Sequence, residues 1–244
     1  MVTLDKPTPA RLHIVSRAVV CAVSAVALVS LAHAGRPFAT DDAAIVAAGA
    51  CQVEAWTERG RDERALWVNP GCNPFGSTEF ALGGARVRVD GEGRFSVLRG
   101  QVKHLFRPVS ETDPGFAIAV GGSRARSVGE REWFVNGIAS LPLSGEERVL
   151  HLNLGAVRTR TDGRARERLT YAAAFDTALW SGGRLALEAF GTSGERAQWQ
   201  LGAKHELIPG HLQVDASVGS AFGRWSKTRR LTVGLVLVSP TVLR

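Results

Sequence analysis

The stretch from Gln198 to Gly219 alternates polar and apolar residues with a period of two, interrupted once by a turn. Polar or small residues at Gln200, Gly202, Lys204 and Glu206 are separated by Trp199, Leu201, Ala203 and Leu207. After Pro209-Gly210 the pattern restarts, with His211, Gln213, Asp215 and Ser217 on one face and Leu212, Val214 and Ala216 on the other. Because successive side chains of a strand point to opposite faces, the pattern predicts a β-hairpin with one polar and one apolar wall.

The same period recurs along most of the chain and predicts about twelve strands. Their expected spans are 51–59, 63–72, 77–89, 93–106, 115–122, 130–142, 147–159, 165–180, 183–192, 196–208, 211–222 and 227–238. The connections are short and rich in turn residues, as at Asp90-Gly91 and Asp162-Gly163. Irregular alternation around Gly83-Gly84 and Leu98 suggests a bulge. We therefore predict an all-β fold, an antiparallel up-and-down β-barrel formed by residues 51–244 as a single domain.

The N-terminus has the features of a cleaved secretory signal peptide. Three basic residues precede or begin an apolar run from Ala18 to Leu31, and Ala32-His33-Ala34 is a small-x-small cleavage site. The run of about 14 residues is shorter than the roughly 20 that a spanning helix needs, which argues against an uncleaved membrane helix. We therefore expect residues 1–34 to be removed and the protein to be exported.

Export leaves two kinds of barrel to consider. In an outer-membrane barrel the apolar face meets lipid and the polar face lines the lumen, whereas a soluble lipocalin-like barrel encloses a ligand with its apolar face. Twelve strands are an even number and exceed the eight of a lipocalin, and charged residues accumulate on the polar face. The prediction is a transmembrane barrel of the cell outer membrane, with a soluble periplasmic ligand-binding barrel as the alternative.

The six Trp residues are consistent with such a barrel. If the first strand rises from the periplasm, Trp56, Trp67, Trp133, Trp199 and Trp225 fall towards the outer half and Trp180 lies near the inner rim. Amphipathic indole rings favour the interface between membrane and water. We expect a thin aromatic girdle, with scattered packing roles as the alternative.

The charge balance narrows the partners. The formal net charge of +7 falls to +5 when the expected signal peptide, with three Lys or Arg and one Asp, is removed. The basic residues are scattered over the strands, and an exported chain seldom meets nucleic acid, so no nucleic-acid partner is expected. A basic lumen, or contact with outer-membrane lipid and anionic lipopolysaccharide, fits this distribution better.

Cysteine positions predict one disulfide. One of the three cysteines leaves with the signal peptide, so Cys51 and Cys72 remain in an oxidising compartment. A two-residue loop at Arg61-Asp62 sets Cys51 opposite Cys72 and Trp56 opposite Trp67. Cross-strand neighbours are close enough for a bridge, which would fasten the first hairpin; two unpaired thiols are the alternative.

Residues 35–50 precede the first strand and do not alternate. Thr40 and Asp41 can cap a short helical turn over residues 43–48, and this role is favoured over cation binding by the Asp41-Asp42 carboxylates. Because a twelve-stranded barrel has a narrow lumen, the segment can also act as a plug. We expect a periplasmic or plug segment here.

Two segments carry a family resemblance. The mature N-terminus reads Gly35-Arg36-Pro37-Phe38-Ala39-Thr40-Asp41-Asp42-Ala43, and the following strand contains Glu54-Ala55-Trp56. These residues, with those from His205 to Ser217, resemble a family of Gram-negative outer-membrane transporter-like barrels, some of them linked to phenol-degradation pathways. The family typically shows an R-P-x-x-T-D-D-A segment. The resemblance implies an outer-membrane barrel and passage of small organic solutes. One departure is the C-terminus, which ends on Arg244 where such barrels usually end on an aromatic residue.

Charged and polar residues of the polar face are the candidate lumen-lining residues. Fixed charges in a lumen select solutes and also cross-link the wall through salt bridges. The candidates are Glu54, Arg86, Arg88, Arg166, Arg168, Asp176, Arg184, Glu188, Lys204, Glu206, His211 and Asp215. The histidines show no metal-ligand spacing, so neither a metal nor a cofactor is expected.

Catalysis is the main rival to a channel. His151 shares a face with Asn153, and His211 with Asp215 and Ser217, so an outer-membrane hydrolase acting on lipid or peptide is conceivable. However, no G-x-S-x-G elbow is present, and the alternation alone accounts for these positions. We therefore expect a non-enzymatic channel or transporter-like protein for small solutes, with aromatic and anionic molecules as candidates. The hydrolase and the soluble binding barrel are the alternatives.

Overall fold

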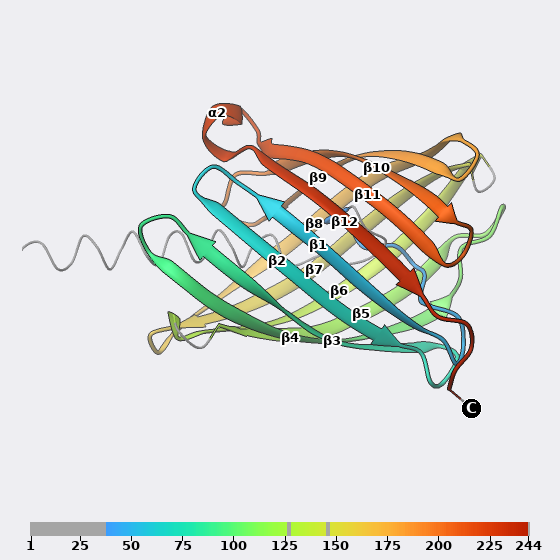
Figure 1. Ribbon diagram of the computed structural model, residues 1–244, viewed down its shortest axis with the longest axis horizontal. Helices are drawn as coiled ribbons and strands as arrows, with labels where there is room; N and C mark the ends of the chain where they lie inside the picture. The colour runs from blue at the N-terminus through green and yellow to red at the C-terminus, as the bar shows by residue number, and fades with distance from the viewer. Residues whose placement is uncertain (1–37, 126–127, 145–146, 244) are drawn as a thin grey trace, which may run out of the picture.

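The computed structural model describes residues 38–125, 128–144 and 147–243, so the predicted signal peptide and residues 35–37 lie outside the described residues. Twelve antiparallel strands form a closed barrel in chain order, and β12 pairs with β1 to complete it (Figure 1). The strands are β1 (Cys51–Arg59), β2 (Glu63–Cys72), β3 (Thr78–Val89), β4 (Gly93–Arg107), β5 (Gly115–Ala125), β6 (Glu130–Ser144), β7 (Arg148–Thr161), β8 (Arg164–Trp180), β9 (Gly183–Thr192), β10 (Gln198–Ile208), β11 (Leu212–Ala221) and β12 (Arg230–Val238). A short helix, α2 (Trp225–Thr228), lies between β11 and β12.

The predicted fold class and strand number are confirmed. The bounds of β1, β2 and β9 agree with the expected spans, and the others differ by a few residues. The first hairpin has the expected register, with Cys51 opposite Cys72 and Trp56 opposite Trp67. The bulge expected at Gly83-Gly84 is wrong, because β3 keeps one continuous register with β4 there.

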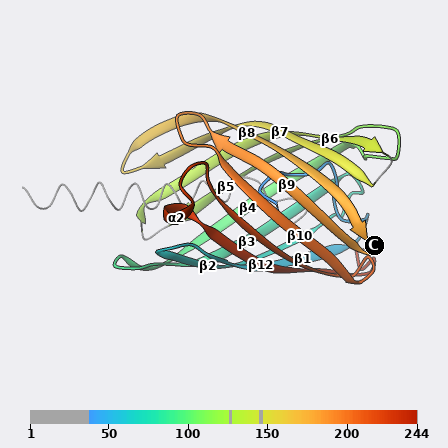
Figure 2. The same ribbon diagram turned by 90° about the horizontal axis from the view of Figure 1, so that it is seen from above.

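The two ends of the barrel differ. β1 begins and β12 ends at the same end, which we call the terminal end; it is on the right in Figure 1. The opposite end, which we call the distal end, carries the β1–β2 turn and α2. The view turned by 90° shows strongly tilted strands (Figure 2), as closure of a barrel requires.

The walls of the barrel are inverted relative to those of a water-soluble protein. On β7, Leu154 is 69% exposed on the outer face, whereas its neighbour Asn153 is 7% exposed on the inner face. Leu82, Val233 and Leu201 are likewise exposed, while Asp176 and Glu188 are buried inside. The predicted alternation therefore places a polar wall inside and an apolar wall outside.

No helix within the described residues is long and apolar enough to cross a membrane.

An apolar cluster occupies part of the barrel interior near the distal end. Trp56 and Trp67 are each 3% exposed and stack with their ring centroids 5.5 Å apart, and Val87, Val89 and Phe95 pack in the same cluster. The prediction that these two Trp belong to an aromatic girdle is therefore wrong, because strand parity turns both rings inward. Exposed Trp residues on the outer wall include Trp133 and Trp180.

The disulfide joins the first hairpin as predicted. Cys51 and Cys72 lie 4.0 Å apart at their Cα atoms and are bonded across a sequence separation of 21 residues. The bridge closes β1 onto β2 at the terminal end, immediately after the N-terminal segment. It therefore fixes the point at which that segment joins the wall.

Replacing both cysteines, in the variant Cys51→Ser/Cys72→Ser, is expected to lower the free energy of unfolding by roughly 3 kcal/mol, because a bridge of this span constrains the unfolded chain. Urea unfolding in detergent micelles, followed by Trp fluorescence, measures the change. Wild-type protein treated with a reductant that breaks the bridge should shift by a similar amount. An unchanged midpoint in both samples would show that the bridge adds no stability.

Candidate functional site

Residues 38–50, which we call the lumen segment, run inside the barrel at its terminal end (Figures 1 and 2). The helical turn predicted over residues 43–48 is wrong, since the segment contains no helix. The physical reason is that backbone N–H groups of the segment donate to side chains on the inner wall. Those bonds replace the bonds that a helix would make within the segment.

The first anchor of the lumen segment is Glu188 on β9. Its carboxylate accepts hydrogen bonds from the backbone N–H groups of Ala39 and Thr40, at 2.9 and 2.8 Å, and from the Thr40 hydroxyl at 2.7 Å. Glu188 and Thr40 are each only 2% exposed. A single buried carboxylate therefore satisfies three donors of the segment.

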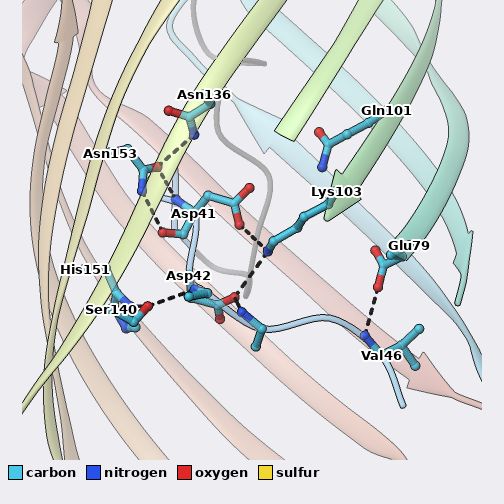
Figure 3. A network of polar contacts seen from close by, with 12 residues as sticks. Asp41, Asp42, Val46, Glu79, Gln101, Lys103, Asn136, Ser140, His151 and Asn153 are labelled. Carbon is cyan, nitrogen blue, oxygen red and sulfur yellow. Dashed lines mark hydrogen bonds and ion pairs between the residues drawn. The ribbon is translucent and has the colours of Figure 1, made fainter. Parts of the chain in front are cut away.

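Asp41 is the second anchor and binds two parts of the wall. Its carboxylate lies 2.5 Å from the ammonium of Lys103 on β4 (Figure 3). Its backbone N–H donates to the Asn153 side-chain oxygen at 2.6 Å, and its carbonyl accepts from the Asn153 amide nitrogen at 2.8 Å. Asn136 donates to the same Asn153 oxygen at 3.2 Å. Asn153 therefore binds both backbone groups of Asp41 and is itself held by Asn136, while Lys103 pairs with the Asp41 carboxylate.

The third anchor is built around Ser140 on β6. The Ala43 backbone N–H donates to the Ser140 hydroxyl oxygen at 2.8 Å, and that hydroxyl lies 2.8 Å from Nδ1 of His151. The Asp42 carboxylate lies 3.4 Å from the Lys103 ammonium, so Lys103 contacts both carboxylates of the segment (Figure 3).

The end of the lumen segment is fixed at the terminal rim. The Val46 N–H donates to Glu79 at 2.9 Å, and Asn73 donates to the Val46 carbonyl at 2.7 Å. Gly49 has a φ of +74° and donates to the Asn73 carbonyl, while its own carbonyl accepts from the N–H groups of Val242 and Leu243. The C-terminal tail therefore lies against the same rim as the lumen segment.

The ion pair between Lys103 and Asp41 is enclosed, with side-chain exposures of 5% and 2%. Removing one partner of a buried pair leaves an uncompensated charge and typically costs about 3–5 kcal/mol. We therefore identify this pair and the Glu188 anchor as the contacts on which the seating of the lumen segment depends.

A second charge cluster lies beside the lumen segment. Asp176 on β8 is 2.7 Å from Arg184 and 3.3 Å from Lys204, and His151 approaches it at 4.0 Å. The Lys204 ammonium also lies 5.4 Å from the ring centroid of Phe38 in the lumen segment. The cluster cross-links β8, β9 and β10 from inside.

The predicted lumen residues fall into two groups. Strand parity and burial place most of them on the inner face: Glu54, Asp176, Arg184, Glu188, Lys204 and Asp215. Arg166 and Arg168 also lie on the inner face, nearer the distal end. Glu206 and His211 lie at the terminal mouth. Arg86 and Arg88 are a correction, because they lie on the outer face of β3 with exposed Leu82. Charge alone is a poor guide to side-chain direction near the distal end, where both arginines point outward and remain exposed.

The lumen segment leaves space beside it. A cavity of about 360 Å³ lies between the segment and the continuous arc of wall formed by β10–β12 and β1–β4. Its polar lining includes Glu54, Glu79, Lys103 and Gln213. The segment therefore narrows the lumen at the terminal end without filling it.

Several residues that anchor the lumen segment were missed by the sequence prediction. They are Lys103, Glu79, Ser140, Asn136 and Asn73. All except Asn73 sit at inward positions of strands, so full use of the alternation would have found them. Nothing in the sequence indicates that they contact residues 38–50.

The residues considered for catalysis do not form a free nucleophile site. Of these residues, His151 contacts through Nδ1 the hydroxyl of Ser140, which is 0% exposed and already accepts from the lumen segment. His211 is exposed at the terminal mouth, whereas Asp215 and Ser217 are buried further along β11. The arrangement supports positioning of the segment rather than attack on a substrate.

Across residues 38–125, 128–144 and 147–243, no group of three or more His, Cys, Asp or Glu is placed to hold a metal ion.

A family model matches residues 22–238. The chain belongs to the family described as uncharacterised conserved protein UCP029691. No curated protein matches the sequence. The family assignment therefore covers nearly the whole chain but brings no established activity with it.

Solved structures share the fold at low sequence identity. The KdgM porin in complex with disordered oligogalacturonate is 10% identical with a TM-score of 0.59, covering 76% of this chain and 98% of that one. The COG4313 outer membrane channel from Pseudomonas putida F1 is 12% identical with a TM-score of 0.59, covering 81% and 98%. The NanC porin is 5% identical with a TM-score of 0.59, covering 77% and 98%. At these identities the likeness establishes the fold alone.

Replacing Lys103 with Met is expected to unseat the lumen segment. The change leaves Asp41 buried without its cation, so amide exchange in residues 38–50 should accelerate on the order of a hundredfold or more. Hydrogen exchange with mass spectrometry of the detergent-solubilised protein measures it. Lys227→Met on exposed α2 is the matched control and should leave exchange unchanged. Equal exchange in the two variants would contradict the role of the ion pair.

Proposed function

We propose that this protein is an outer-membrane channel for small solutes whose lumen is narrowed by its own N-terminal segment. The observation that carries the proposal is the inversion of the barrel walls, with exposed Leu and Val outside and buried Asp, Glu, Lys and Asn inside. An apolar outer wall on a closed barrel suits a lipid environment, since every strand edge is paired. The expected signal peptide supports export.

The fold neighbours support the same function class. Their names describe two porins and an outer membrane channel, and each is covered almost completely by the alignment. The protein would perform no covalent chemistry and require no cofactor. Its terminal end would face the periplasm and its distal end the exterior.

The lumen segment, residues 38–50, would act as a plug that moves. Its anchors are individual side-chain hydrogen bonds and ion pairs, rather than strand pairing. Such contacts can be exchanged for water one at a time, so the segment can leave the lumen while the barrel stays closed. Withdrawal would join the 360 Å³ cavity to the space that the segment vacates.

Anionic solutes are the favoured class. When the segment withdraws, the carboxylates of Asp41 and Asp42 leave the lumen, and Lys103 loses its ion pairs with both of them. Arg99 and Lys204 also project from the inner wall. The open lumen would therefore be more positive than the plugged one, which attracts anions. Aromatic solutes, including those of phenol degradation, rest on the family resemblance alone.

Deleting residues 38–47 should increase conductance in planar lipid bilayers several-fold, because the deletion removes the segment that narrows the lumen. Measurements in a KCl gradient should show that the selectivity of the deleted channel is shifted towards anions relative to the wild type. Heat-modifiable gel mobility and the Cys51–Cys72 bridge verify that the barrel still folds.

The matched control is Glu167→Gln, which changes an exposed carboxylate on the outer face of β8. It should conduct like the wild type. A folded deletion variant without conductance would refute the channel, whereas a wild type that conducts equally well would refute the plug.

A further inference from the structure

The outer wall carries a groove that the channel function does not use. It has a volume of about 1160 Å³ and runs over β3 to β8. Five exposed apolar side chains from four strands line it: Leu82, Leu98, Val120, Trp133 and Val135. A hollow of this kind on an outer barrel wall can receive an extended hydrocarbon chain.

Glycines form the floor of the groove. Gly100 on β4 lies opposite Leu82 and opposite Gly122 on β5, and Gly122 lies opposite Trp133 on β6. A Cβ atom added at Gly122 would lie only 2.9 Å from the Trp133 ring, so the indole lies over this glycine. Trp133 is nevertheless 67% exposed. The missing side chains therefore create a trough with an indole at one side.

A row of arginines lies next to this floor, two residues further along the strands towards the distal end. Arg131 on β6 is directly opposite Arg124 on β5 and also opposite Arg160 on β7. All three are exposed, and within the described residues no carboxylate lies within salt-bridge distance of them. Like charges directly opposite in a sheet repel each other. The repulsion within the row therefore destabilises the folded barrel unless an anion binds across the three arginines.

The row differs from the neighbouring part of the outer face, where positive and negative side chains pair. Arg158, beside Trp133, does have a partner and lies 3.6 Å from Glu167. A second set of cross-strand arginines continues around the distal rim, with Arg64 opposite both Arg59 and Arg88, of which Arg88 also lies 3.7 Å from Asp90. Positive charge is thus concentrated on the outer face at one end of the apolar groove.

We propose that this groove and the row of Arg124, Arg131 and Arg160 bind a phosphorylated, acylated lipid of the outer leaflet. An acyl chain lies along the glycine floor beside Leu82 and Leu98. Phosphate groups bridge the arginines, whose planar guanidinium groups donate paired hydrogen bonds to phosphate oxygens. Trp133 lies at the boundary between the two regions, where indole rings favour the membrane interface.

The proposal rests on the outer-membrane placement, with the distal end at the outer leaflet. A lipid fits better than a free anion, because the apolar trough and the charged row are continuous. It also fits better than a protein, because the trough is open along a wall that would be covered by lipid chains. Binding would relieve the repulsion between the arginines and would fix the height of the barrel in the membrane.

The test measures binding of a diphosphorylated hexa-acyl glycolipid to the purified, detergent-solubilised protein by native mass spectrometry. Arg124→Gln/Arg131→Gln should weaken binding on the order of tenfold or more, since each basic residue near an anionic lipid surface contributes about fivefold. Gly100→Leu should also weaken it by filling the floor. A Cβ at Gly100 meets the tip of Leu82 at 3.8 Å and the Ala81 carbonyl oxygen at 4.0 Å, both ordinary contact distances, so this change fits the fold.

Arg148→Gln is the matched control, because Arg148 is an exposed arginine at the other end of β7. It should bind like the wild type. A ligand that lacks the phosphates but keeps the acyl chains should bind weakly to every variant. Equal affinity of Arg124→Gln/Arg131→Gln and Arg148→Gln would overturn the proposal, as would binding of inorganic phosphate as tight as that of the glycolipid. Loss of glycolipid binding with unchanged conductance separates this site from the channel.

Discussion

The structure depends on how the interior of a closed barrel satisfies its buried polar groups. Twelve paired strands use up their own backbone donors and acceptors, but their inward side chains still need partners. Glu188, Asn153 and Lys103 each find these partners on residues 38–50. The wall and the lumen segment therefore complete each other, and neither arrangement is explained without the other.

This dependence gives the Thr40-Asp41-Asp42 motif a structural meaning. Each residue supplies a different group to the interior: a hydroxyl to Glu188, a backbone and a carboxylate to Asn153 and Lys103, and a second carboxylate to Lys103. A helix cap, which the sequence pattern suggested, would instead use the side-chain oxygens of Thr40 and Asp41 to accept hydrogen bonds from backbone donors. The donors here belong to an extended chain, and their acceptors come from strands far away in the sequence.

The sequence predicts the barrel well because alternation and turn residues are local signals. The register of the first hairpin, and with it the Cys51–Cys72 bridge, follows from a two-residue loop. The lumen contacts could not be predicted in the same way, because Asp41 and Lys103 are 62 residues apart and no local pattern joins them. Arg86 and Arg88 show the opposite error, since their charge suggested a direction that strand parity contradicts.

Because the lumen segment is covalently joined to β1 at a point fixed by the disulfide and by Gly49, it behaves as a tethered ligand of its own barrel. Its local concentration at the anchors stays constant, at roughly the millimolar level expected for a short connection, however dilute the protein is. In the proposed channel, a free solute would compete with that local concentration rather than enter an empty lumen. A weakly bound solute would therefore have to be abundant before it displaced the segment.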